Sequence, residues 1–322
     1  MTSLSARLVI ALLRGTGQKR FYADPAAMHR SLRSHQKESE PAAWVRRNTT
    51  IERSYVQGFP CYTVRPRTTA RTDLHILHLH GGAYVEQVER HHWRFAALLT
   101  QRLGATVTLP VYPLAPDHSH RTTVPMAEAA YHRFLDSHAP ENRILSGDSA
   151  GGGLALTLAQ RLREQGHPQP AHLAMFSPWL DLTLSDPLSG EIDPRDPMLA
   201  VAGLREAGRL YADGADPAGP ELSPDNADLS GLGPFSIFIG TRDVLLPEAR
   251  RLLHHARQVE IDVDYSEYPG MFHNWIMQPI PEASTALDHL VATLTAGDGS
   301  LAAGPRGDVA AAEQAPDTQP LK

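Results

Sequence analysis

A turn of small residues lies between a strand-like run and a helix-like run near the middle of this chain. The turn, residues 146–152, reads Ser-Gly-Asp-Ser-Ala-Gly-Gly, with the strand-like run 142–145 before it and the helix-like run 154–159 after it. A sharp turn that lifts Ser149 off the end of a strand strains the backbone there, and side chains two positions away on either side would collide. Glycines occupy both of those positions. This Gly-x-Ser-x-Gly pattern between a strand and a helix predicts a nucleophile elbow.

Short apolar runs alternate with helix-like segments on both sides of the turn. We expect strands at 74–79, 105–111, 143–147, 173–176, 235–239 and 263–268, and helices at 91–103, 124–138, 150–165, 247–258 and 282–294. This alternation predicts an α/β fold, with a mostly parallel central sheet covered by helices on both faces. Residues 50–56 and 61–64 alternate around Gly58, which predicts an antiparallel hairpin at the edge of the sheet.

The regular alternation breaks between about residues 181 and 219. This stretch is rich in Pro, Asp and Gly and holds one helix-like piece near 199–211, so it is a candidate lid. Residues 1–48 read as helices joined by polar linkers. Residues 296–322 are rich in Ala, Gly, Pro and Asp, and we expect them to be a disordered tail.

Charge and composition exclude several classes of protein. Lys and Arg total 30 against 36 Asp and Glu, a formal charge of −6 that argues against nucleic-acid binding. The single cysteine, Cys61, allows no intramolecular disulfide. The apolar run 8–13 is shorter than the roughly 7–15 residues of a signal-peptide core, so an amphipathic helix docked on the body is preferred over membrane association. We therefore expect a cytoplasmic protein without membrane insertion, and an oligomer stays possible.

A serine hydroxyl needs a base to accept its proton and a third group to orient that base. Asp243 follows the strand expected at 235–239, and His273 follows the strand expected at 263–268. Both therefore fall at the carboxyl edge of the sheet, in the chain order Ser, Asp, His that one class of hydrolases uses. Asp264, inside a strand, and Glu248, one turn into the next helix, are less favourably placed rivals of Asp243. The constellation predicts Ser149, Asp243 and His273 as the catalytic residues.

The glycine-rich segment His80–Tyr84 follows the strand expected at 74–79. Its glycines would let the backbone approach a substrate closely and point amides at a developing oxyanion. The amide of Ala150, next to the serine at a helix N-terminus, would add another donor. We predict an oxyanion hole formed by Gly81, Gly82 and Ala150.

These motifs together resemble those of the hormone-sensitive-lipase-like esterases of the α/β-hydrolase superfamily. The resemblance spans about residues 44–294 and is carried, with Asp243 and His273, by His80-Gly81-Gly82-Ala83-Tyr84, Tyr112-x-Leu114-Ala115-Pro116 and Gly147-Asp148-Ser149-Ala150-Gly151-Gly152. It implies an α/β-hydrolase fold and carboxylic ester hydrolysis without a metal or organic cofactor. It also implies a helical cap, formed by residues 1–48 and 183–217 over a core of 49–182 and 218–295. The chain departs from the family at Ala83, where a third loop glycine is usual.

Other residues give weaker signals. Tyr84, Trp179, Met28 and Tyr211 could line the substrate pocket, although core packing explains most of them. The pairs His78/His80 and His118/His120 could be metal ligands, but no second ligand motif supports them, so we expect no metal.

The sequence thus predicts a serine hydrolase that cleaves small-molecule esters of short-to-medium acyl chains through an acyl-enzyme. The same catalytic residues could open a lactone or cleave an N-acetyl group or another amide. A non-catalytic small-molecule receptor is the alternative from another class, and the presence of His273 argues against it. The expected cap would set the acyl chain length and the alcohol partner, and its contacts are not readable from one sequence.

Overall fold

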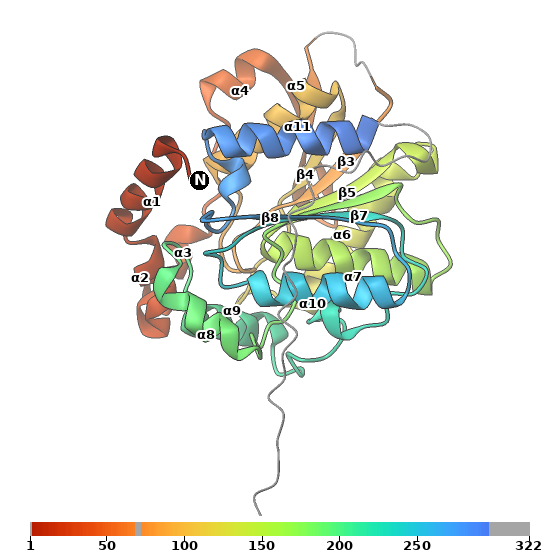
Figure 1. Cartoon of the computed structure of the whole chain (residues 1–322). Helices are drawn as coiled ribbons and strands as arrows, with labels where there is room; N and C mark the ends of the chain where they lie inside the picture. Colours follow the sequence, from red (N-terminus) through yellow and green to blue (C-terminus); the bar gives the residue numbers. More distant parts are fainter. Residues whose placement is uncertain (1, 68–71, 296–322) are drawn as a thin grey trace, which may run out of the picture.

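The computed structural model describes residues 2–67 and 72–295 (Figure 1). The tail predicted at 296–322 lies outside the described residues. Two groups of buried apolar side chains, one on each side of a central sheet, form the core of the protein.

The described residues form one eight-stranded sheet with the strand order β1-β2-β4-β3-β5-β6-β7-β8. The strands are β1 (Thr49–Val56), β2 (Phe59–Pro66), β3 (His75–Leu79), β4 (Thr106–Pro110), β5 (Arg143–Asp148), β6 (His172–Phe176), β7 (Phe235–Gly240) and β8 (Val263–Tyr268). The predicted hairpin is confirmed: β1 and β2 pair antiparallel, and β2 joins β4 antiparallel. The remaining neighbours are parallel.

Helices cover both faces of the sheet, as the alternating pattern predicts (Figure 1). One face carries α5 (Arg90–Leu103) and α11 (Pro281–Thr295), and the other carries α6 (His120–Leu135), α7 (Ala150–Glu164) and α10 (Leu246–Gln258). Every residue of the central strands β3, β5 and β6 is buried. Two of their buried polar groups pair with each other: Nδ1 of His78 in β3 lies 2.9 Å from Oγ of Ser146 in β5.

Two segments far apart in the sequence pack together beside the sheet (Figure 1). The first contains α1 (Leu4–Thr16), α2 (Gln18–Ala23) and α3 (Pro25–His35), and the second contains α8 (Pro187–Ile192) and α9 (Val201–Ala212). The contacts between them are made mainly by α2 and α3 with α9, whereas α4 (Ala43–Asn48) packs on β1 and α5. Lys19 of α2 joins them, because its Nζ donates to Asp193 Oδ1 at 2.8 Å and to the Leu199 carbonyl at 2.9 Å. Short 3-10 helices occur at Pro140–Asn142, Asp193–Arg195, Pro224–Asn226 and Trp275–Met277.

The expected N-terminal amphipathic helix is present as α1. Its Ala6 and Ile10 are buried against the body of the protein. Within residues 2–67 and 72–295, no helix combines the length and apolarity needed to cross a bilayer.

Candidate active site

Ser149 occupies the strained turn that the sequence predicts. It lies between the end of β5 and the start of α7, with φ +51° and ψ −123°. The flanking glycines are required by space: a Cβ on Gly147 would lie 2.1 Å from the Gly151 carbonyl oxygen, and one on Gly151 would lie 2.0 Å from that of Leu79. The nucleophile-elbow conformation is therefore available only to a sequence with glycine at both positions.

The structure brings His273 and Asp243 together beside this serine. His273 Nδ1 lies 2.9 Å from Asp243 Oδ2, and both side chains are buried. Asp243 follows β7, and its Oδ1 also accepts a hydrogen bond from the Leu245 amide at 3.1 Å. His273 follows β8, so both residues stand at the carboxyl edge of the sheet. An Asp that holds Nδ1 leaves Nε2 of the imidazole free to accept a proton.

The rival acids have other partners. Glu248 Oε2 accepts hydrogen bonds from the Leu180 amide at 2.7 Å and the Asp181 amide at 3.1 Å, which ties α10 to the segment after β6. Burial raises the pKa of Glu248 well above its ordinary value. Asp264 lies in β8, 3.1 Å from Nε2 of His289. Neither carboxyl group is placed to orient His273.

The backbone amides around Ser149 require one correction to the predicted oxyanion hole. The Gly81 amide donates to Asp148 Oδ1 at 3.0 Å, so it is already engaged. Among the described residues no acceptor takes the amides of Gly82, Ala83 or Ala150. Gly82 and Ala83 both have positive φ, +118° and +50°. We therefore replace Gly81 by Ala83 as a candidate donor and retain Gly82 and Ala150.

Asp148, which the sequence analysis did not single out, connects three parts of the site. Its carboxylate accepts from the Gly81 amide and, at 2.6 Å, from Nδ2 of Asn274, the neighbour of His273. Nε2 of His78 lies 3.3 Å from it and Nε2 of His92 lies 3.6 Å from it. Burial raises the pKa of Asp148, but His92 and His78 lower it by more than burial raises it. The pKa of this carboxyl group therefore lies well below its usual range. Asp148 thus holds the glycine loop and the segment of His273 against the serine turn.

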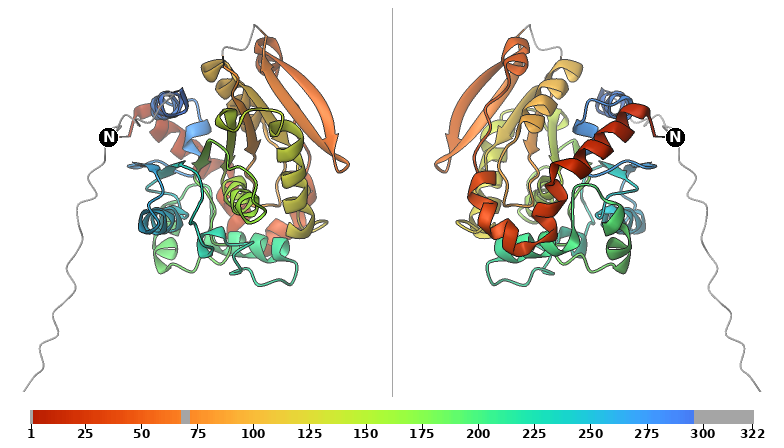
Figure 2. Two further views of the ribbon diagram at one scale, coloured as in Figure 1. Left: turned by 90° about the vertical axis from the view of Figure 1, so that its right-hand side faces the viewer. Right: turned by 90° about the vertical axis from the view of Figure 1, so that its left-hand side faces the viewer.

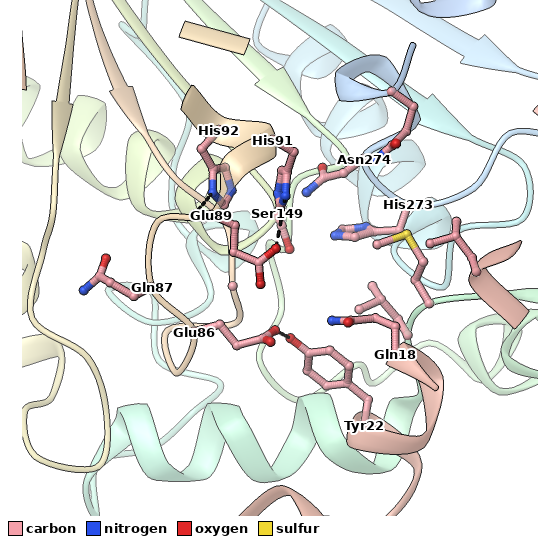
Figure 3. Close-up of a pocket in the computed structure, with 15 residues that line it drawn as sticks. Gln18, Tyr22, Glu86, Gln87, Glu89, His91, His92, Ser149, His273 and Asn274 are labelled. Carbon is pink, nitrogen blue, oxygen red and sulfur yellow. Dashed lines mark hydrogen bonds and ion pairs between the residues drawn. The ribbon is translucent and has the colours of Figure 1, made fainter. Parts of the chain in front are cut away.

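Ser149 and His273 both line a cavity of about 180 Å³ (Figure 3). The cavity lies between the carboxyl edge of the sheet and α2, which contributes Gln18 and Tyr22. Further polar side chains in its wall come from Glu86, Gln87, Glu89, His91, His92 and Asn274 (Figure 3).

The four aromatic and methionine residues expected in the pocket are packed in the interior. Tyr84 stacks on Tyr211 with ring centroids 3.7 Å apart, and Trp179 lies 5.9 Å from Tyr84. Met28 is completely buried. Of the described residues, those that line the cavity include none of these four. Trp179 instead contacts the turn itself, since its amide donates to the Ser149 carbonyl at 2.9 Å.

Known proteins are similar to this chain in sequence and in fold. A family model described as the alpha/beta hydrolase fold matches residues 76–277. An acetyl-hydrolase of Streptomyces hygroscopicus is 36% identical over 229 residues, which cover 70% of this chain and 76% of that protein. An esterase of Acinetobacter venetianus is 33% identical over 216 residues, 66% of this chain and 71% of that protein. The crystal structure of an esterase from the bacterial hormone-sensitive lipase family superposes with a TM-score of 0.78 at 30% identity, covering 91% of this chain and 98% of that one.

The chain belongs to the hormone-sensitive-lipase-like esterases of the α/β-hydrolase superfamily. It is a carboxylic ester hydrolase. Within the described parts of the chain, no group of three or more His, Cys, Asp or Glu side chains is arranged to hold a metal ion.

The charge environment of His273 in this esterase favours a basic imidazole. Burial lowers the pKa of His273, but the charge of Asp243 and its hydrogen bond raise it more, so the pKa lies above the ordinary value. A second carboxyl group, Asp196, contributes in the same direction. If His273 is the base that accepts a proton, activity should rise as the pH passes through this elevated pKa, because only the unprotonated imidazole can act.

Asp196 is a residue near Asp243 that sequence reasoning missed. Asp196 lies between α8 and α9 and is buried against the loop of Asp243. Its Oδ1 accepts hydrogen bonds from the amides of Met198 and Leu199, and its Oδ2 accepts one from the Val244 amide at 3.1 Å. Burial and the charge of Asp243 raise the pKa of Asp196 to about 6. An aspartate inside an irregular, proline-rich segment gives no sequence signal of this contact.

Asp196→Asn should move the pH dependence of this esterase. Asparagine retains an oxygen acceptor for the Met198 and Leu199 amides but removes the charge that raises the pKa of His273. We expect the acid limb of kcat/KM against pH to shift to lower pH, by up to about one unit. Asp193→Asn, on the same segment, is the control and should leave the limb in place. An unmoved limb in Asp196→Asn, or one displaced to higher pH, would contradict this assignment.

Proposed function

We propose that this esterase is a serine hydrolase that cleaves short-chain carboxylic esters through an acyl-enzyme. The observation that carries the proposal is the 2.9 Å contact between His273 Nδ1 and Asp243 Oδ2 beside Ser149, whose strained turn opens into the same cavity. A base held by an acid, next to a serine that lines a cavity, is the arrangement that nucleophilic acyl transfer needs.

The proposed reaction has two steps. Ser149 Oγ attacks the ester carbonyl while His273 Nε2 takes the hydroxyl proton. The imidazolium then gives that proton to the leaving alcohol, and the ester bond breaks to leave the acyl group on Ser149. In the second step His273 takes a proton from water, the hydroxide attacks the acyl carbon, and the proton returns to Ser149 as the acid leaves. Asp243 stabilises the imidazolium throughout.

Negative charge that develops on the carbonyl oxygen would be held by the amides of Gly82, Ala83 and Ala150. The amide of Ala150 stands at the N-terminus of α7, where the helix dipole also favours negative charge. Asp148 would keep the glycine loop in place by its bond to the Gly81 amide. The loop would then need little rearrangement as the charge develops.

The cavity favours small acyl groups. Its volume of about 180 Å³ is below the roughly 300–1,000 Å³ typical of pockets for larger ligands. The Streptomyces relative, named as an acetyl-hydrolase, agrees with such a substrate. We propose that residues 1–48 and 183–217 act as a cap that limits the length of the acyl chain. Both segments contribute to the cavity wall, the first through α2 and the second through Leu199.

Covalent labelling tests the proposed nucleophile. An alkyl p-nitrophenyl phosphonate should inactivate the enzyme with one adduct per chain, and peptide mass spectrometry should find it on Ser149. Turnover of a matched acetyl ester, acetyl amide and lactone then separates ester cleavage from the two alternatives, with the ester expected to be fastest. A labelled serine other than Ser149, or hydrolysis without labelling, would refute the mechanism.

The acidic wall of the cavity leads to a prediction about substrate charge. Glu86 and Glu89 line it, and the lining residues within the described ranges include no Lys or Arg. A hydrogen bond from His91 lowers the pKa of Glu89, which keeps this carboxyl group ionised at neutral pH. An alkyl acetate ending in a carboxylate should therefore be a poorer substrate than the neutral acetate of the same length.

Glu89→Gln should reduce the difference in kcat/KM between the neutral and the anionic acetate. The amide can still accept from the His92 backbone at the start of α5, but the charge is gone. We expect kcat/KM for the anionic acetate to rise by about 3- to 10-fold, with little change for the neutral one. Glu52→Gln, on the exposed strand β1, is the matched control. Equal effects on both substrates would show that Glu89 does not select by charge.

A further inference from the structure

Three of the most exposed large apolar side chains in the described part of the chain lie on one helix. Leu4, Leu8 and Leu12 of α1 are 77%, 71% and 66% exposed. Residues four apart share one face of an α-helix, so these leucines form a continuous stripe, which we call the leucine stripe. Single exposed leucines are common on protein surfaces, whereas a contiguous apolar patch indicates an interaction site.

The leucine stripe is not the result of an undocked helix. The opposite side of α1 is held on the body by Ala6 and Ile10, which are buried. The start of the helix is fixed by Ser3, whose amide donates to Glu282 Oε1 at 2.6 Å. The right-hand view of Figure 2 shows α1 (red) running across the face of the molecule turned to the viewer. The helix thus carries two apolar faces, one packed and one open.

The charged side chains of α1 and α2 are all basic. Residues 1–23 contain no Asp or Glu, although the whole chain has a formal charge of −6. Arg7, Arg14 and Arg20 are exposed, and no ion pair engages them within the residues that the structure describes. By helical spacing, Arg7 and Arg14 lie seven residues apart on one line beside the stripe. An apolar face flanked by arginines matches helices that lie in the surface of an anionic membrane.

We propose that the leucine stripe docks α1 on a phospholipid surface that carries anionic headgroups. In this arrangement the helix would lie in the plane of the interface without crossing it, with the leucines among the acyl chains and Arg7 and Arg14 at the headgroups. A second copy of the chain fits the surface less well, because a two-fold contact would bring the same arginines face to face. The charge complementarity therefore favours lipid.

Docking would place the cavity beside the lipid surface. Leu13, on the packed side of α1, and Gln18, at the start of α2, both line the cavity that contains Ser149. An ester dissolved in the interface would then enter close to the serine. This consequence rests on the proposed function, whereas the docking itself depends only on α1.

Vesicle binding tests the docking directly. The full-length protein would be sedimented with sucrose-loaded vesicles of phosphatidylcholine alone and of phosphatidylcholine with about one third phosphatidylglycerol. We expect binding to the anionic vesicles to be at least about tenfold stronger and to fall at high salt. Leu4→Gln/Leu8→Gln/Leu12→Gln should reduce binding by about tenfold or more, and Arg7→Gln/Arg14→Gln should remove the preference for anionic lipid.

Controls separate docking from folding and from the proposed mechanism. Tyr55→Gln/Val259→Gln changes exposed apolar residues away from α1 and should bind as the wild type does. Thermal melts without vesicles should be the same for all variants, since every substituted side chain is exposed, and vesicle binding is read without any hydrolysis. Absence of vesicle binding by the wild type would overturn the proposal. So would a dimer in light scattering that the triple variant abolishes, because the stripe would then be an interface between copies.

Discussion

Ser149→Ala should lower kcat for p-nitrophenyl acetate by roughly 10⁵-fold or more while the protein stays folded. The substitution removes the atom proposed to form the acyl-enzyme and leaves the proposed backbone donors of Gly82, Ala83 and Ala150 in place. Residual hydrolysis would come from those donors and from substrate binding alone. Alanine and serine differ by one hydroxyl group, so the strained turn and its glycines should tolerate the change. Hydrolysis assays with p-nitrophenyl acetate would measure kcat, and a thermal melt of the purified variant would show whether it is folded.

A matched serine gives the control for this experiment. Ser189 in α8 is also buried, and its Oγ has no hydrogen-bond partner among the described residues. Ser189→Ala should keep activity within about twofold of the wild type, because it removes a hydroxyl group that binds nothing and lies outside the cavity lining. Near-normal turnover by Ser149→Ala would refute the assigned nucleophile, even if the enzyme remains an esterase.

The sequence predicted the sheet and its helices well, because the apolar residues of the buried strands form short runs that alternate with helix-like segments. Strand β5, the turn at Ser149 and helix α7 follow from local sequence alone. The start of α6 was placed too late in the chain: the structure begins the helix at His120, ahead of Pro125. A proline inside a helix removes one backbone hydrogen bond and usually marks a boundary, but α6 accommodates Pro125 as its sixth residue.

The parts of the site that depend on tertiary contacts were not predictable in this way. The donor role assigned to Gly81 failed because the carboxylate of Asp148, 67 positions later, takes its amide. Asp196 meets the loop of Asp243 only because the segment after β6 folds back over the sheet edge. The expected pocket residues Tyr84 and Tyr211 stack on each other, a pairing across more than a hundred residues that no local pattern encodes. Motif residues reveal which chemistry is possible, while long-range hydrogen bonds decide which backbone groups remain free for it.

Asp243→Asn should lower kcat by about 10⁴-fold, the second largest effect that we expect. Asp243 Oδ2 accepts from His273 Nδ1, and Oδ1 accepts from the Leu245 amide. An asparagine would use its oxygen for that amide and turn its NH₂ group toward His273. The imidazole would then carry its proton on Nε2, where it cannot accept one from Ser149. A pre-steady-state burst with a p-nitrophenyl ester would be lost, because acylation itself becomes slow.

The two rival acids make this prediction specific. Glu248→Gln keeps an oxygen for the Leu180 and Asp181 amides, and because burial already raises the pKa of Glu248, glutamine resembles its protonated form. Asp264→Asn changes a carboxyl group that faces His289. Both variants should retain activity within about threefold of the wild type, since neither group touches His273. If Glu248→Gln were inactive and Asp243→Asn active, the orienting acid would be Glu248, and the contact between Asp243 and His273 would be structural.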